Sequence, residues 1–143
     1  MNKLTPILTV EAIEPLLPFW THGVGFQVTA RVPHPPDAAD GPLGFVILSH
    51  GEVELMLQTL ASLEKDLGPV AREAGIPDLP RKLMESTPVL FLQVDAVDAV
   101  LDRLDAPTVV VPRRTTFYGM DEIFLMAPGG ALLGIAAPVA AAG

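Results

Sequence analysis

The spacing of apolar residues changes from strand-like to helix-like at two places in the chain. The segments ILTVEAIEPLL (7–17) and FLQVDAVDAVL (91–101) match each other position for position in aliphatic and acidic character. In each segment alternating apolar residues give way to apolar residues spaced i, i+3 and i+4, and the i+7 positions just beyond the segments, Trp20 and Leu104, complete the pattern of an amphipathic helix. We therefore predict a strand followed by a helix, occurring twice as an internal repeat.

Each predicted strand–helix unit is followed by strand-like runs, separated by Gly- and Pro-containing turns. These runs are 26–32, 43–50 and 53–59 in the first half and 108–114, 120–126 and 131–137 in the second. The pattern predicts an α+β protein with two βαβββ modules, the first over 4–59 and the second over 88–137. Residues 60–87 form a connector, with a helical stretch over 63–73 and a loop containing prolines. Because neither half could bury a sizeable core alone, we expect one domain over residues 1–143.

Composition and charge exclude several classes of protein. Half of the 143 residues are hydrophobic and 18% are charged, which argues against disorder. The net charge of −8, with no basic cluster, makes nucleic acid or an anionic membrane surface an unexpected partner. The chain contains no cysteine, so disulfides, thiol nucleophiles and iron–sulfur sites are excluded. With neither a spanning apolar run nor a signal-peptide pattern, we expect a cytoplasmic protein.

Local sequence adds a family resemblance to the repeat. The segments VEAIEPLLPFWTHGVGF, QVDAVDAVLDRL and YGMDEIFLMAPGGALLGIA resemble the two module openings and the closing segment of the vicinal oxygen chelate superfamily. This superfamily includes glyoxalases, bleomycin resistance proteins and extradiol dioxygenases. The resemblance implies two βαβββ modules whose curled mixed sheets surround a central cleft.

The resemblance also implies where a divalent metal ion would bind in enzymatic members. The first-strand ligands fall near Thr5 and Val89, and the last-strand ligands fall at Glu54 and Gly134. Only one of these four positions carries a carboxylate, whereas divalent ions require several oxygen or imidazole ligands. We therefore predict no metal and no other cofactor. The alternative is one divalent ion held by unconventional ligands.

The period-two pattern assigns the two faces of the predicted sheets. The consistently aliphatic positions should pack on the helices: Leu8, Val10, Leu55, Leu57, Leu90, Leu92, Val94, Leu133 and Ile135. The opposite face mixes apolar and hydrogen-bonding side chains, as small-molecule sites do: Ile7, Thr9, Glu54, Met56, Gln58, Phe91, Gln93 and Ala136. The alternative is that this face forms a second, closed core.

Two further residues, Arg113 and Tyr118, are candidates for ligand binding on and after a strand of the second module. An arginine there could bind a carboxylate or phosphate, or could instead protect an exposed sheet edge. Because Arg113 and Arg114 are adjacent, their side chains should point to opposite faces of the strand, so at most one should enter the pocket.

Three functional hypotheses remain open. The first is a metal-free protein that binds a small, partly apolar or cationic molecule, in a sequestration or resistance role. The second is an enzyme, either a metal-dependent lyase, isomerase or dioxygenase, or a metal-free enzyme with Glu54 as general base. The third is a structural or regulatory module whose pocket has decayed. In each case we expect a homodimer, because the exposed apolar strands of half-barrels need covering.

Overall fold

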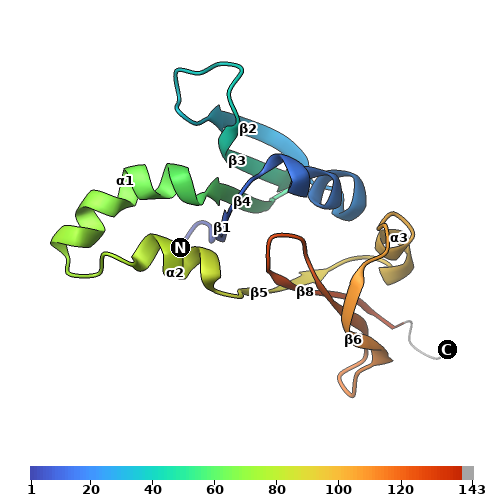
Figure 1. Cartoon of the computed structure of the whole chain (residues 1–143). Coiled ribbons are helices and arrows are strands. Elements are labelled where there is room, and N and C mark those ends of the chain that lie inside the picture. The colour runs from blue at the N-terminus through green and yellow to red at the C-terminus, as the bar shows by residue number, and fades with distance from the viewer. Residues whose placement is uncertain (140–143) are drawn as a thin grey trace.

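The computed structural model describes residues 1–139 and contains two four-stranded mixed sheets with the same topology (Figure 1). The first sheet has the order β1-β4-β3-β2, with strands β1 (Ile7–Val10), β2 (Gln27–Pro33), β3 (Leu43–His50) and β4 (Val53–Thr59). The second has the order β5-β8-β7-β6, with strands β5 (Val89–Gln93), β6 (Thr108–Thr115), β7 (Met120–Met126) and β8 (Leu132–Pro138). In both sheets the first strand pairs in parallel with the last, and the other pairs are antiparallel. The predicted α+β fold is confirmed.

The helical segment of the first module is less regular than its apolar spacing predicts. It consists of a short 3₁₀ turn, η1 (Glu14–Leu16), and a π-helical segment, η2 (Phe19–Val24). Pro15 lies in the first turn of η1, and Pro18 immediately precedes η2. Because proline has no backbone N–H and its ring clashes with the preceding turn, an uninterrupted α-helix cannot pass through both positions. The apolar side still faces the core, since Ile13, Leu16 and Trp20 are all buried.

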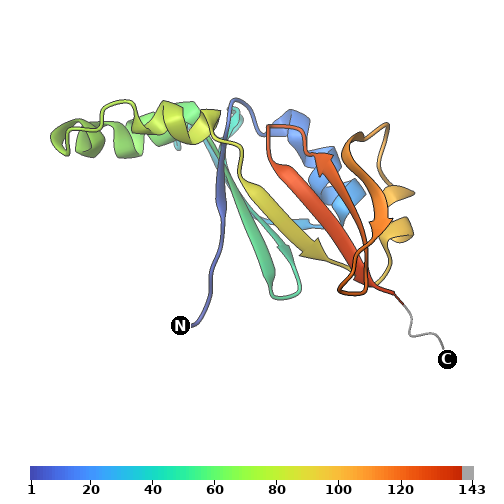
Figure 2. The same cartoon turned by 90° about the horizontal axis from the view of Figure 1, so that it is seen from below.

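The connector consists of two helices, α1 (Leu60–Glu73) and α2 (Leu79–Glu85). The Thr59 side chain caps α1 by accepting a hydrogen bond from the Ser62 N–H at 3.2 Å. The second helix was predicted as a loop because of its prolines. Pro80, however, lies in the first turn of α2, where the missing N–H would have no helical partner. Both helices extend away from the second sheet (Figures 1 and 2).

The two modules share one hydrophobic core on their helix-covered faces. It joins side chains of β1, β3, β4, η1 and η2 to those of β7, β8 and the second module's helix α3 (Val97–Leu101). Close approach between the modules requires Gly129 in the β7–β8 turn, since a Cβ there would lie 2.9 Å from Leu16 Cδ1. This glycine also has a φ of +93°, a conformation that L side chains rarely adopt. The buried core residues of the two modules thus form a single hydrophobic cluster.

Candidate functional site

The sheet faces opposite the shared core, called the open faces, are exposed along β1 and β5, whereas Ala136 of β8, predicted on the same face, is fully buried. On β1 and β4, Leu8 and Leu57 are buried in the core, whereas their neighbour Ile7 is 55% exposed. The same alternation occurs on β5, where Leu92 packs against the core and Phe91 is 53% exposed. The period-two assignment of faces therefore agrees with the burial of these strands. The open faces hold most of the residues predicted to bind a ligand.

The open face of the first sheet carries a row of side chains from β4 and its neighbour β1. Met56 lies opposite Ile7, and Gln58 lies opposite Thr9 in the parallel pairing. The Gln58 amide donates hydrogen bonds to Ser62 Oγ at 3.2 Å and to an Asp66 carboxylate oxygen at 3.3 Å, both on α1. The connector thereby fixes the orientation of a predicted site residue.

Glu54 lies on the same face, next to the segment that precedes β1. Thr5 Oγ1 donates a hydrogen bond to Glu54 Oε1 at 3.3 Å, and Lys3 Nζ lies 2.6 Å from Glu54 Oε2. Thr5 and Glu54 are thus neighbours, as the family resemblance implies. The charge of the carboxylate is balanced by a lysine of the same chain.

The open face of the second sheet is aromatic. The rings of Phe91 and Phe124 lie with centroids 6.3 Å apart, at an angle of 50°. Gly134 lies opposite both residues in the register of β8 with β5 and β7. A Cβ at Gly134 would lie 2.7 Å from Phe124 Cε1 and 3.1 Å from Phe91 Cδ2, so the two rings occupy the space that a side chain would fill.

A buried carboxylate, Glu122, lies on the same face of the second sheet, where its residue pairs with Ala136 of β8. Glu122 is only 1% exposed. Tyr118 Oη donates to Glu122 Oε2 at 2.7 Å, and Arg114 Nη2 donates to Glu122 Oε1 at 3.0 Å. The hydrogen bond from Tyr118 and the arginine partner hold the pKa of Glu122 below its usual value, against the effect of burial. The same hydrogen bond raises the pKa of Tyr118.

Arg113 points to the opposite face from Arg114. Its guanidinium donates to both carboxylate oxygens of Asp121, at 2.9 and 2.6 Å, and also pairs with Asp98 of α3. These hydrogen bonds lower the pKa of both aspartates. The predicted site residue Arg113 is therefore engaged on the helix-covered side, and Arg114 lies beside Tyr118 on the open face. The sequence predicts that at most one of the two arginines enters the pocket and names Arg113 as the candidate, whereas Arg114 is the one that lies on the open face.

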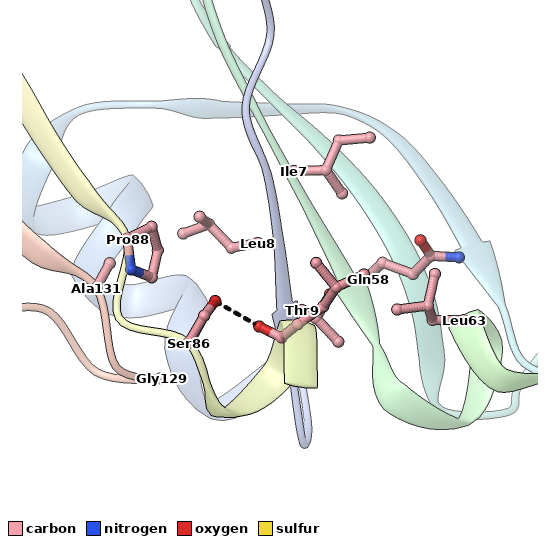
Figure 3. Close-up of a pocket in the computed structure, with 10 residues that line it drawn as sticks. Ile7, Leu8, Thr9, Gln58, Leu63, Ser86, Pro88, Gly129 and Ala131 are labelled. Carbon is pink, nitrogen blue, oxygen red and sulfur yellow. Dashed lines mark hydrogen bonds between the residues drawn. The ribbon is translucent and has the colours of Figure 1, made fainter. Parts of the chain in front are cut away.

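Three predicted residues come together at a cavity of about 290 Å³ between the first sheet and the connector (Figure 3). Ile7, Thr9 and Gln58 contribute from the sheet, and Ser86 Oγ donates a hydrogen bond to the Leu83 carbonyl at 2.8 Å. Pro88, Gly129 and Ala131 contribute from the second module, and Leu63, Leu83 and Ser86 from the connector. The connector residues of this wall were not anticipated from the sequence, because they lie outside both repeats.

The remaining predicted residues are distributed elsewhere. Glu54 and Phe91 line a second cavity of about 330 Å³ between the modules, and Gln93 lines a third of similar size. Met56, Arg113 and Tyr118 line none of these three cavities. The sequence-predicted set is therefore divided among several places rather than gathered around one centre.

The residues at the family's metal-binding positions do not fit a divalent ion. Thr5 and Glu54 are adjacent, but Lys3 occupies the carboxylate. In the second module Val89 lies opposite Leu132, and Gly134 lies opposite Phe91. Neither of these two pairs of the second module offers a side-chain atom that could coordinate a metal ion. Within residues 1–139, no group of three or more His, Cys, Asp or Glu side chains could hold a metal ion.

Comparison with known proteins identifies a family and a fold. The model of the Glyoxalase/Bleomycin resistance protein/Dioxygenase superfamily matches residues 3–135. No curated protein matches the sequence. Among the helices of the described residues, none is long and apolar enough to cross a membrane.

Solved structures with the same fold have low sequence identity to this chain. A glyoxalase-related enzyme from Fulvimarina pelagi has 18% identity and a TM-score of 0.66, over 100% of this chain and 96% of that one. A glyoxalase/bleomycin resistance protein/dioxygenase from Nocardioides has 16% identity and a TM-score of 0.64, over 99% of this chain and 86% of that one. The bleomycin-binding protein from Streptomyces verticillus, complexed with copper(II)-bleomycin, has 15% identity and a TM-score of 0.57, over 97% of this chain and 98% of that one. At these identities the likeness extends to the fold alone.

Proposed function

The chain belongs to the glyoxalase/bleomycin resistance protein/dioxygenase superfamily, and on this basis we propose that it is a metal-free protein that binds a small, partly apolar molecule. The observation that carries the proposal is the contrast between the metal positions and the open faces. The only carboxylate at a metal position is paired with Lys3. The open faces, in contrast, combine apolar side chains with a few fixed hydrogen-bonding groups, as small-molecule sites do.

The side chains on the open faces indicate the chemistry of the ligand. Phe91 and Phe124 offer flat apolar contacts, and Met56 offers an adaptable one. Gln58 and Arg114 are held in place by other side chains of the protein, so they can orient a polar group without losing further rotamer freedom. The net charge of −8 favours encounter with a cationic compound. Binding of a bleomycin by a protein of the same fold is consistent with this ligand class.

A homodimer and a cytoplasmic location belong to the same proposal. The helix-covered faces of the two modules pack against each other in the shared core, and large apolar side chains of the opposite faces stay exposed. Ile7, Val89 and Phe91 all remain more than half exposed. A second copy would cover these side chains and complete the cavity walls. Sedimentation analysis should therefore show a dimer, and Phe91→Asp should give monomers that retain the wild-type circular dichroism spectrum.

Elemental analysis and thermal unfolding of the purified protein together test the metal-free binding proposal. We expect far less than one equivalent of Ni, Zn, Mn or Fe per chain, and no rise in Tm when these ions are added. Metal-free bleomycin is the organic probe. At a concentration 100 times its Kd, a ligand stabilises the folded state by about 2.7 kcal/mol, which raises Tm by several degrees.

The same measurements can refute the proposal. A stoichiometric, tightly bound ion would instead support a metal-dependent lyase, isomerase or dioxygenase with unconventional ligands. A protein that bleomycin does not stabilise, and whose open faces also give no NMR shifts with smaller aromatic cations such as benzyltrimethylammonium, would favour a module without a ligand.

A further inference from the structure

A bulge in strand β6 turns Arg114 toward the open face of the second sheet. Val111 of β6 lies opposite Phe124 of β7. The next matched pair is Arg114 with Glu122, so three steps along β6 correspond to two along β7. The bulge contains Pro112 and lies on the outer strand of the sheet, where a proline is tolerated. Bulges are common beside functional sites because they re-aim a side chain, and this one places the Arg114 guanidinium beside Glu122.

Glu122 holds the Arg114 side chain in one orientation. Nε and Nη2 of Arg114 donate to the same carboxylate oxygen, Oε1, at 3.3 and 3.0 Å, and Tyr118 Oη donates to the other oxygen at 2.7 Å. Glu122 is 1% exposed, and a buried ion pair is often no more stable than apolar residues of the same size. Stability alone therefore does not account for this carboxylate, whereas the orientation of Arg114 does.

One edge of the Arg114 guanidinium remains available to a ligand. Glu122 engages Nε and Nη2, so Nη1 is not used by this carboxylate. The Arg114 side chain is 56% exposed, although the carboxylate that holds it is buried. A guanidinium can only donate hydrogen bonds, so the group that it binds must supply an acceptor atom. Because the arginine is already held in place, binding costs little further side-chain entropy.

An aromatic surface adjoins this donor. In the register of β6 with β7, Phe124 is the diagonal neighbour of Arg114, and such neighbours lie about 7–8 Å apart, within reach of long side chains. Phe124 keeps part of its surface exposed, and its ring lies beside that of Phe91, which is 53% exposed. A flat molecule that stacks on Phe124 can therefore present a substituent to Arg114.

The charge around Arg114 favours an uncharged acceptor over an anion. The guanidinium is already paired with the Glu122 carboxylate, so an anion bound at Nη1 would also lie near a second negative charge. The chain as a whole carries a net charge of −8, which disfavours encounter with anions. A carbonyl oxygen accepts the same hydrogen bond without either penalty.

We propose that the open face of the second sheet binds a flat aromatic molecule that bears an uncharged carbonyl group, with the ring against Phe124 and the carbonyl oxygen accepting a hydrogen bond from Arg114 Nη1. The inference rests on the proposed small-molecule function and specifies its ligand class. Arg114 is the specificity-determining residue, and Glu122 and Tyr118 are positioning residues that act through it.

Three probes of nearly the same shape test the site on the full-length protein: acetophenone carries a carbonyl group, benzoate carries a carboxylate, and cumene carries neither. In ¹H–¹⁵N titrations we expect acetophenone to shift the backbone amide signals of Arg114, Glu122 and Phe124. It should bind about five-fold more tightly than cumene, as one hydrogen bond allows, and more tightly than benzoate.

Arg114→Met removes the donor, so acetophenone and cumene should bind to this variant equally. Arg113→Met is the matched control, because it removes the same group from the neighbouring residue, which pairs with Asp121 on the helix-covered side. The five-fold ratio should be unchanged in the control.

Glu122→Gln separates positioning of Arg114 from a purely structural role. Glutamine keeps the shape of the side chain and removes its charge, so the guanidinium is no longer neutralised. Benzoate should bind about five-fold more tightly than to the wild type and should overtake acetophenone. A loss of stability alone would not reverse the order of the two probes.

The wild-type titrations decide the matter even if a variant fails to fold. Equal binding of acetophenone and cumene, tighter binding of benzoate than of acetophenone, or no amide shifts on the second sheet with millimolar acetophenone would each overturn the inference. An equal loss in Arg113→Met and Arg114→Met, or an unchanged order of the probes in Glu122→Gln, would also overturn it. Shifts confined to the cavity beside the connector would refute this site while leaving the proposed function intact, since that function depends on the metal and bleomycin measurements.

Discussion

Gly134→Ala tests whether the aromatic open face of the second sheet depends on a missing side chain. The added Cβ would lie 2.7 and 2.8 Å from two atoms of the Phe124 ring and 3.1 Å from the Phe91 ring. Ordinary van der Waals contacts between carbon atoms begin near 3.5 Å, so at least one ring must move. Overpacking of this kind costs about 1–3 kcal/mol. The cost should fall near the middle of this range, at about 2 kcal/mol, because two contacts with the Phe124 ring lie below 3.0 Å although Phe124 is only partly buried.

A second effect acts in the opposite direction. Replacing glycine by alanine within a strand gains about 0.5–1 kcal/mol, because the unfolded chain loses conformational freedom. Gly134 does not have a positive φ, so alanine can adopt its backbone conformation. The net expectation is a destabilisation of about 1 kcal/mol, or a fall in Tm of a few degrees for a chain of this length. Urea unfolding followed by circular dichroism measures the difference.

The double mutant supplies the matched control. With Phe124→Leu in place, the two ring atoms nearest the new Cβ are gone, so Gly134→Ala should become neutral or stabilising. The sign of the effect should therefore change between the two backgrounds, which is a coupling that a double-mutant cycle detects. If Gly134→Ala is as stable as wild type, or equally destabilising in both backgrounds, the steric argument is refuted.

Three other predictions follow from the contacts of charged and polar side chains. Tyr118→Phe removes the donor at 2.7 Å and should raise the pKa of Glu122, which the carboxyl ¹³C shift reports; an unchanged pKa would contradict the geometry. Asp98 and Asp121, which pair with Arg113, have lowered pKa values in the folded protein. Their contribution to the free energy of unfolding is therefore complete above the pKa of about 4 that they have in the unfolded chain, and it is lost as the pH falls through their pKa values in the folded protein. In Arg113→Met, the free energy of unfolding should therefore fall less steeply as the pH is lowered below about 4. A fall as steep as in the wild type would count against this pairing. Glu54→Gln breaks a pair with a half-exposed lysine and should change stability by less than about 1 kcal/mol. Loss of a catalytic activity in this variant would favour the general-base hypothesis.

The strands could be predicted from the sequence, but the irregular segments could not. Alternation of apolar residues marks a strand with one buried face directly, because the spacing of side chains on a strand does not depend on its neighbours. The helix of the first module has the correct apolar spacing, yet Pro15 and Pro18 divide it into a 3₁₀ turn and a π-helical segment. The helix α2 was missed because Pro80 was interpreted as a loop signal, although proline is well tolerated in a first turn.

In the candidate site, too, the residues on regular strands could be predicted from the sequence and those on an irregular strand could not. Ile7, Thr9, Met56 and Gln58 lie on strands without irregularities, so alternation alone assigns them to the open face. The pairing of β6 with β7 shifts register between Val109 and Val111 and again between Val111 and Arg114. Each shift can change the face to which a side chain points, and this is why the sequence did not identify which of the two arginines lies on the open face.

The duplicated fold carries two open faces with different chemistry. At corresponding positions opposite the first strand of each module, the first sheet has Met56 and the second has Gly134. Met56 contributes its side chain to the face of the first sheet. Gly134 has no side chain, and the rings of Phe91 and Phe124 occupy the space above it. A ligand held between the first module of one chain and the second module of another would therefore meet a flexible thioether wall on one side and a flat aromatic wall on the other. Such a pair of walls would recognise a molecule by its shape and by a few hydrogen bonds, which is the chemistry that the proposed metal-free binding function requires.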